Sequence, residues 1–132
     1  MYRLLKIIED DATRFLKLNN LETNIIDDCF DDSALVSNNN FDFMKVGQKY
    51  DCKIKLFGKP LDSKKEGCLT CIITNNNVTI GNKDFTEVLV NKNKYYVSQS
   101  KAQKYSYHNR FYFYCTRKEL IQVNEVIHAD LI

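Results

Sequence analysis

The sequence predicts an all-β domain, mainly antiparallel, and three observations carry this prediction. Most apolar segments alternate with a period of two residues and are rich in Ile, Val, Tyr, Phe and Thr. Clusters of Asn, Asp, Gly and Lys separate these segments, as turns do between strands. The length of 132 residues suits a single domain. Because closing a sheet removes its exposed edges, we expect a small closed or partly closed barrel of about eight strands.

The N-terminal third differs from the rest of the chain in charge. Residues 1–40 carry four basic and eight acidic side chains, whereas residues 41–132 carry fifteen basic and nine acidic ones. The alternation predicts strands at residues 2–9, 13–18 and 23–30, the first two forming a hairpin. We therefore expect an acidic N-terminal hairpin extension, residues 1–40, that packs on a barrel formed by residues 41–132.

The clearest strand covers residues 49–57 and ends at Gly58. One side of it is apolar and the other is charged, which is typical of a strand with one buried and one wet face. The inward residues are Tyr50, Cys52, Ile54 and Leu56, and the outward residues are Lys49, Asp51, Lys53 and Lys55.

Four shorter segments follow this strand. A strand is expected over residues 68–74, and the asparagines at 75–77 predict a turn into a short strand at residues 78–80. Further strands are expected at residues 85–90 and 94–97, which a polar turn connects.

The last third contains both helical and strand-like patterns. Residues 98–104 fit a loop or one short helix. The segment 104–115 alternates as a strand. Residues 116–128 have the spacing of a capping box and a helical stripe, but their β-branched residues favour a strand. Whether residues 120–131 are strand or helix stays open from the sequence.

The stretch FMKVGQKYDCKIKLFG, residues 43–58, resembles the entry into the first long strand of OB-fold RNA-binding barrels. Val46, Gly47 and Gln48 match the residues that lead into that strand, and Gly47 would permit a sharp turn there. The resemblance implies a groove for an oligonucleotide or another extended ligand.

An aromatic and basic segment is the strongest functional signal. No acidic residue occurs between Glu87 and Glu119, an interval that holds seven basic residues and eight of the sixteen aromatic ones. Cations that follow phosphates and aromatic rings that stack on bases are what single-stranded nucleic acid requires. In residues 104–115 the odd-numbered aromatics are expected in the core. The candidate binding residues are Tyr95, Tyr96, Lys101, Lys104, His108, Arg110, Tyr112 and Tyr114.

These residues predict a non-enzymatic binding module for single-stranded nucleic acid. The alternative is a protein-interaction, inhibitory or homodimerising domain that uses the same face to bind an acidic protein surface or a second copy, because Tyr and Arg are equally typical of protein interfaces. The sequence does not distinguish DNA from RNA. Four carboxylates, at Asp27, Asp28, Asp31 and Asp32, predict a solvated turn or a partner for the protein's own basic residues.

The sequence contains no motif that assigns a catalytic residue, a cofactor or a metal ligand. Cys68 and Cys71 have the spacing of a zinc or redox pair, but no second pair completes a site. His108 and His128 lie outside any nucleophile and base motif, so an enzyme stays an open and less favoured alternative. No apolar run is long enough for a membrane span, and the odd number of cysteines favours the cytoplasm. The Asn, Lys and Ile content indicates bacterial-like, A+T-rich codons.

Overall fold

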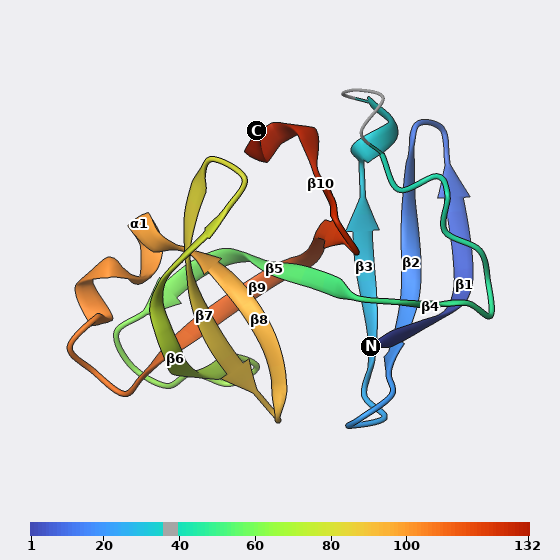
Figure 1. The fold of residues 1–132 in the computed structure, drawn as a ribbon. Helices are drawn as coiled ribbons and strands as arrows, with labels where there is room; N and C mark the ends of the chain where they lie inside the picture. Colours follow the sequence, from blue (N-terminus) through green and yellow to red (C-terminus); the bar gives the residue numbers. More distant parts are fainter. Residues whose placement is uncertain (36–39) are drawn as a thin grey trace.

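A computed structural model describes residues 1–35 and 40–132 and shows a mainly β protein (Figure 1). Its described residues form ten strands in one mixed sheet. The strands are β1 (Tyr2–Asp10), β2 (Thr13–Asn20), β3 (Ile26–Asp31), β4 (Lys49–Tyr50), β5 (Cys52–Leu61), β6 (Leu69–Ile80), β7 (Lys83–Val90), β8 (Asn93–Ser98), β9 (Arg110–Val123) and β10 (Val126–Ile127). The fold class predicted from the alternation is confirmed, with more strands than the expected eight.

Helical structure is short. The helix α1 (Gln99–Ala102) lies where the sequence predicts a loop or a helical turn, and the 3₁₀ turns are η1 (Ser33–Leu35), η2 (Gln103–Tyr105) and η3 (Ala129–Leu131). Within the described ranges, no helix has both the length and the apolar character needed to cross a membrane.

Five strands pair in a ring. The order runs β9, β5, β8, β7 and β6, and β6 pairs again with β9 through Leu69–Phe113 to Ile72–Arg110. The pairs are antiparallel except β5 with β8, which meet in parallel at Lys55 and Tyr96. The β7–β8 hairpin turns through Asn91 and Lys92, both with positive φ, as the right-handed twist of a hairpin requires.

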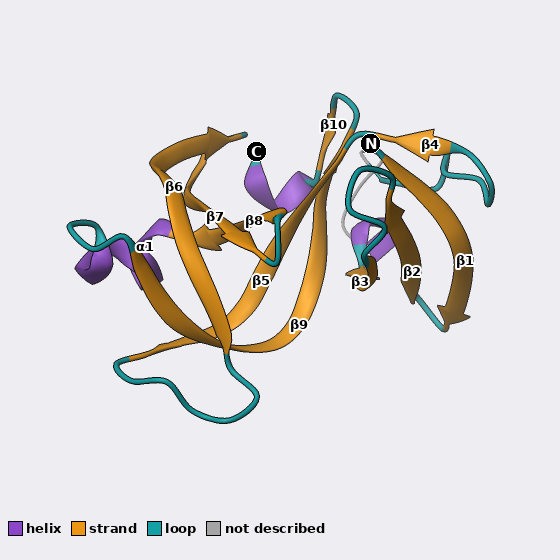
Figure 2. Ribbon diagram, turned by 90° about the horizontal axis from the view of Figure 1, so that it is seen from below, coloured by secondary structure: helices purple, strands orange, loops and turns teal. Residues whose placement is uncertain are grey.

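The N-terminal strands extend the sheet beyond this ring. β1, β2 and β3 form an antiparallel meander, β4 adds to the outer side of β1, and β3 joins β9 in parallel. Figure 2 shows β9 as a long curved strand that connects the ring with the N-terminal strands. The boundary expected after residue 40 borders on residues 36–39, which lie outside the described residues. β4, which follows this boundary in the chain, pairs with β1, which precedes it.

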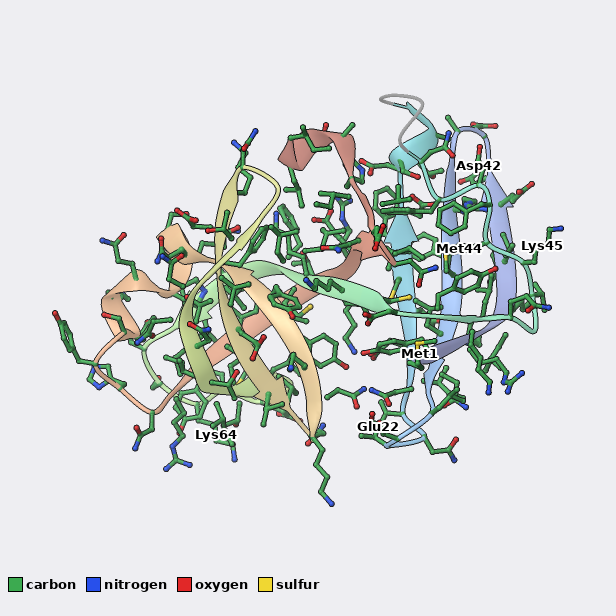
Figure 3. All side chains as sticks on the ribbon, in the orientation of Figure 1. Met1, Glu22, Asp42, Met44, Lys45 and Lys64 are labelled. Carbon is green, nitrogen blue, oxygen red and sulfur yellow. The ribbon has the colours of Figure 1, made fainter. Side chains whose placement is uncertain are left out.

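Two apolar clusters lie on opposite faces of the sheet. The main cluster combines N-terminal residues such as Leu16 with ring residues such as Phe113. Met44 packs in it, whereas the next residue, Lys45, points to solvent (Figure 3). The second cluster contains Tyr96 and Ile121, whose neighbours in the chain belong to the first cluster. Since successive strand residues face opposite sides, the C-terminal segment covers the outer face of the ring there.

Three local predictions were wrong. Residues 75–77 do not turn the chain, because β6 runs through them with register shifts on both sides. Asn75 instead binds the amide of Asn77 with its side-chain oxygen, at 3.1 Å. The strand predicted at residue 104 begins at Arg110, since residues 103–109 form successive turns, and Tyr107 is 99% exposed rather than in the core. The third strand begins at Ile26, after Asn24 adopts positive φ.

Two other local predictions are confirmed. The segment 116–123 continues β9, so the strand reading of that part is correct and the helical stripe is not used. Gly47 has a φ of 91°, as expected for a sharp turn before the strand.

Candidate functional site

The outer surface of β5 and β9 gathers aromatic and basic side chains. We call this surface the aromatic–basic face. Its residues are Phe30, Lys55, Phe57, Lys59, Lys101, Arg110, Tyr112, Tyr114 and Arg117.

Alternation along β9 creates the first half of this face. Phe111 and Phe113 are buried in the ring, with 2% and 0% of their surface exposed. Their neighbours therefore point outward, as predicted: Arg110 is exposed, Tyr112 is partly buried and Tyr114 is 49% exposed. Tyr114 lies opposite Lys59 of β5, which is also exposed.

A β-bulge adds Arg117 to the same face. Gly58 pairs with Cys115 and Phe57 pairs with Arg117, so Thr116 is the extra residue of β9. Without this bulge, alternation along β9 would place Arg117 on the same side of the strand as Cys115, facing the ring interior. The alternation of the sequence contains no signal for the bulge, which is why Arg117 and Phe57 were missing from the predicted site.

Three cations surround the ring of Phe57. The Lys101 Nζ lies 4.8 Å, the Arg117 Cζ 5.1 Å and the Lys55 Nζ 5.7 Å from the ring centroid. Arg117 also stacks on Phe30, at 4.3 Å. Each such cation–π contact contributes about 0.5–1 kcal/mol at an exposed site. Phe57 itself is 39% exposed, so solvent reaches this cluster.

Two acceptors, the Glu119 carboxylate and the Gly58 carbonyl, fix the directions of these cations. The Arg117 Nε donates a hydrogen bond to Glu119 Oε2 at 2.8 Å, and its Nη2 lies 2.7 Å from the same oxygen, while the Lys55 Nζ lies 3.8 Å from Glu119 Oε1. Lys101 extends from α1 and donates to the carbonyl of Gly58 at 2.6 Å. Two of the three positive charges thus share one carboxylate, and the third meets only a backbone carbonyl, which leaves a surplus of positive charge beside exposed rings.

Two of the predicted site residues lie inside the protein instead. Tyr95 and Tyr96 are 2% and 5% exposed. Tyr95 donates to Asp27 Oδ2 at 2.5 Å, and Tyr96 donates to Glu87 Oε2 at 3.3 Å. Burial raises the pKa of both phenols well above the ordinary value. Neither ring offers a face to a ligand in this conformation.

The remaining predicted residues lie at the margin of the face. Lys104 pairs with Asp62 at 2.9 Å, and the same carboxylate accepts a hydrogen bond from Tyr105 at 2.8 Å. These bonds lower the pKa of Asp62 and raise that of Lys104. His108 is exposed in the turn before β9, with its ring 6.2 Å from the Tyr105 ring. Of the eight predicted residues, Lys101, Arg110, Tyr112 and Tyr114 belong to the face.

No protein-family model matches this chain, and no curated protein or solved structure is significantly similar to it.

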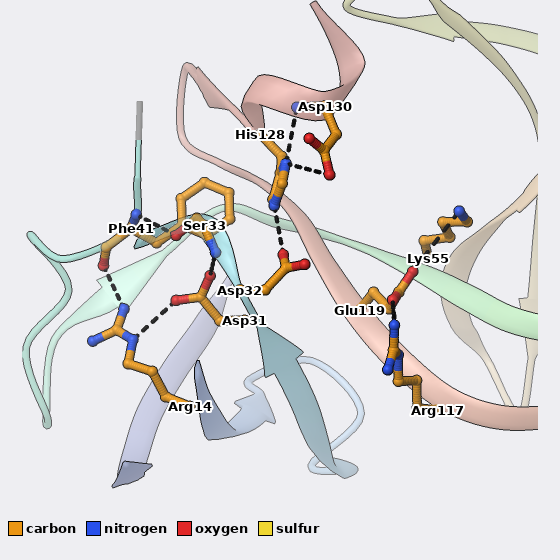
Figure 4. Close-up of polar contacts among 10 residues, drawn as sticks. All are labelled: Arg14, Asp31, Asp32, Ser33, Phe41, Lys55, Arg117, Glu119, His128 and Asp130. Atoms are coloured by element: carbon orange, nitrogen blue, oxygen red, sulfur yellow. Dashed lines mark hydrogen bonds and ion pairs between the residues drawn. The ribbon is translucent and has the colours of Figure 1, made fainter. Parts of the chain in front are cut away.

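The acidic N-terminal residues have partners within the chain. Asp27 and Asp31 are each 2% exposed and form ion pairs with Lys118 and Arg14 respectively. Arg14 also donates to the carbonyl of Phe41 at 2.7 Å (Figure 4). The expectation of a solvated turn was wrong, because the first three carboxylates lie in β3. Of the expected pairing with the protein's own basic face, only the ion pair of Asp27 with Lys118 reaches the basic part of the chain among the described residues, since Asp28 and Asp31 pair with Lys17 and Arg14 of the N-terminal third.

A second polar cluster lies under the C-terminal turn. His128 Nδ1 accepts a hydrogen bond from the amide of Asp130 at 3.1 Å, which assigns the proton to Nε2, and Nε2 donates to Asp32 Oδ1 at 2.7 Å (Figure 4). The ligand atoms of Asp32, His128 and Asp130 are close enough to hold a metal ion. A metal at either nitrogen would displace one of these bonds, so the geometry suits a connection between η3 and the residue that follows β3 better than a metal site.

A cleft of about 360 Å³ separates the N-terminal strands from the β7–β8 hairpin. Lys53, Lys92 and Lys94 line it together with Glu22 and Asp51. Lys94 in turn lies 3.9 Å from Glu87. These mixed charges select no particular ligand.

The buried cysteines should resist alkylation in the native protein. Burial raises the pKa of Cys52 and of Cys71 to about 12 and raises that of Cys29 well above its usual range, so few thiolates form at neutral pH. Cys68 is partly exposed. We expect a pulse of iodoacetamide, followed by mass spectrometry, to modify Cys68 first. Labelling of Cys71 at the rate of Cys68 would contradict this expectation, and denatured protein provides the fully labelled control.

Proposed function

We propose that this protein is a non-enzymatic module that binds single-stranded nucleic acid on its aromatic–basic face. The observation that carries the proposal is the Phe57 ring, exposed and surrounded by Lys55, Lys101 and Arg117. Exposed Tyr114 and Arg110 continue the same surface along β9. The rings offer faces for base stacking, and the surplus cations offer sites for phosphates.

An OB-fold-like arrangement is part of this proposal. Five strands close the ring, and residues 43–58, which carry the resemblance, lead into its first strand, β5. OB folds bind oligonucleotides across strand faces. The proposed ligand likewise crosses neighbouring strands, from Tyr114 of β9 to Phe57 of β5.

Fluorescence anisotropy with labelled single strands of mixed sequence tests the proposal. We expect the wild-type protein to bind DNA or RNA strands at low salt and to lose affinity steeply as salt rises. Five cations on the face, Lys55, Lys59, Lys101, Arg110 and Arg117, predict a slope of log K against log salt of about −3.5, at ~0.7 per neutralised phosphate. The absence of binding at low salt, or binding that salt does not weaken, would refute the proposal.

The Tyr114→Ala protein should bind single strands more weakly. Loss of one stacked base corresponds to about 1–3 kcal/mol, which is roughly a 5- to 150-fold rise in Kd. Since Tyr114 is half exposed, the fold should survive, which circular dichroism can check.

Tyr107→Ala is the matched control for this variant. Tyr107 is 99% exposed but lies in the turn before β9, outside the face. We expect its substitution to leave the Kd unchanged. Equal losses for both tyrosines would mean that general aromatic exposure, rather than this face, governs binding.

A further inference from the structure

We propose that two copies of this chain join edge to edge through β1, around a two-fold axis at Ile8. This interface lies on a different surface from the aromatic–basic face. The dimer does not depend on the proposed function, and three features of β1 support it.

First, the outer edge of β1 lacks a strand partner over much of its length. β2 pairs with β1 along the whole hairpin, but on the other side β4 reaches only Tyr2 and Arg3. Leu4 exchanges backbone hydrogen bonds with Gly47 and Gln48. Beyond it, residues 6–10 pair with no further strand in the described part of the chain, and β1 lies at the rim of the molecule (Figure 2). An unpaired edge of this length is a template for another strand.

Second, the charges along this edge are self-complementary. Lys6, Ile8 and Asp10 share the outward side of β1, since Ile7 and Glu9 between them lie on the side of the buried Leu16 and Arg14. An antiparallel partner related by a two-fold axis at Ile8 places Ile8 opposite its own copy. The same register places Lys6 opposite Asp10 of the second copy, twice per dimer. Opposite charges in such cross-strand pairs are favourable.

Other registers are less favourable. A slip of one residue would place outward side chains against inward ones. A two-fold axis at Glu9 would set two glutamates against each other, and an axis at Ile7 would leave Lys6 opposite Ile8. The side chains of Lys6 and Asp10 are exposed, and neither makes a hydrogen bond or ion pair with the described residues. They are therefore available to a second copy.

Third, an exposed apolar row ends at this edge. Ile8 lies opposite Phe15 of β2, and Phe15 lies opposite Phe30 of β3, with ring centroids 5.5 Å apart. Ile8 is 49% and Phe15 is 42% exposed. Contact between the two copies of Ile8 would join both rows across the axis and bury apolar surface at its centre.

The two-fold axis also sets how the two aromatic–basic faces of the dimer are oriented. A two-fold axis perpendicular to the sheet keeps the outward sides of both copies on one side, so Phe30 and Arg117 of each copy would face the same way. If the proposed function holds, the dimer would offer two aromatic–basic faces to one extended ligand, which raises its apparent affinity.

Cysteine cross-linking tests the register. The Ile8→Cys protein should form a covalent dimer on mild oxidation, because residues directly opposite in antiparallel strands have Cβ atoms about 4.5–5.5 Å apart. Asp10→Cys is the matched control, since the two copies of residue 10 would lie several residues apart along the strands. Wild-type protein in parallel accounts for the native thiols. Equal cross-linking of both variants, or none in the Ile8→Cys protein, would overturn the proposed register.

Sedimentation equilibrium tests the dimer itself, without any nucleic acid. We expect a concentration-dependent dimer for the wild type, and a dimer Kd raised by roughly tenfold in the Lys6→Asp and Asp10→Lys proteins. The double variant Lys6→Asp/Asp10→Lys restores opposite charges and should dimerise like the wild type. A wild type that is monomeric at its highest concentration, or a double variant no better than either single one, would overturn the proposal.

Discussion

Replacing Lys118 by methionine is expected to lower the free energy of unfolding by about 3 kcal/mol. Lys118 Nζ forms an ion pair with Asp27, whose side chain is 1% exposed, and Asp27 accepts one further hydrogen bond from Tyr95. Methionine keeps an apolar stem of similar length but leaves a carboxylate buried without its cation. The Lys118 side chain is 28% exposed, so the lower end of the range known for broken buried pairs applies. Urea unfolding at constant m-value measures the loss.

The pair between Lys17 and Asp28 is the matched control. It joins neighbouring residues of β2 and β3 at 2.9 Å, but its side chains are 37% and 61% exposed. Lys17→Met should therefore cost less than about 1 kcal/mol. The double variant Asp27→Asn/Lys118→Met should recover most of the loss, since it removes the buried charge together with its partner. Equal costs for Lys17→Met and Lys118→Met would show that burial does not set the strength of these pairs.

The same ion pair joins the acidic N-terminal third to the basic remainder of the sequence. The four aspartates of residues 27–32 belong to the acidic N-terminal third, and Lys118 belongs to the basic remainder. Lys118 lies opposite Cys29 where β3 joins β9 in parallel, so the charges meet at the junction of the N-terminal strands with the ring. The sequence shows the imbalance. It does not show that two of these aspartates are buried, because alternation of polar residues looks the same on either face.

Alternation predicted much of the fold because one face of most strands is buried. It located the β1–β2 hairpin, the inward residues of β5, and Phe111 and Phe113 in the ring. It failed where a strand contains an extra residue. The bulge at Thr116 reverses the expected side of Arg117, and the irregular pairing of residues 75–77 replaces a predicted turn.

The candidate site was predicted in part for a related reason. Alternation implies that one of two successive residues faces solvent. This rule was sufficient to predict that Arg110 and Tyr114 are exposed. Tyr95 and Tyr96 are both buried, because the ring encloses one side of β8 and the C-terminal segment covers the other. Only tertiary structure decides whether a second layer covers the outer face of a strand. Lys55 and Phe57 reach the site through pairing with Glu119 and Arg117, 64 and 60 residues away in the chain, which no local pattern encodes.

Gly58→Ala is expected to cost at least about 2 kcal/mol of stability and to weaken binding on the aromatic–basic face. Gly58 pairs with Cys115 next to the bulge. A Cβ at position 58 would collide with the carbonyl oxygen of Tyr114, and it would lie 2.9 Å from the Tyr114 carbonyl carbon and 3.1 Å from the Cys115 Cα. These are backbone atoms, so relief requires β5 and β9 to move apart. Thermal and urea unfolding would measure the loss of stability.

Gly67→Ala separates this steric effect from the general cost of replacing a glycine. Gly67 has a φ of 79° but open space around its Cα, so its substitution should cost about 1 kcal/mol through backbone strain alone. It should also leave nucleic-acid binding unchanged. Gly58→Ala should lower both stability and nucleic-acid binding. The separation of β5 from β9 that it forces would move Phe57 away from Arg117 and would break the hydrogen bond from Lys101 to the Gly58 carbonyl. A Gly58→Ala protein with wild-type stability would show that β5 and β9 do not need this close approach.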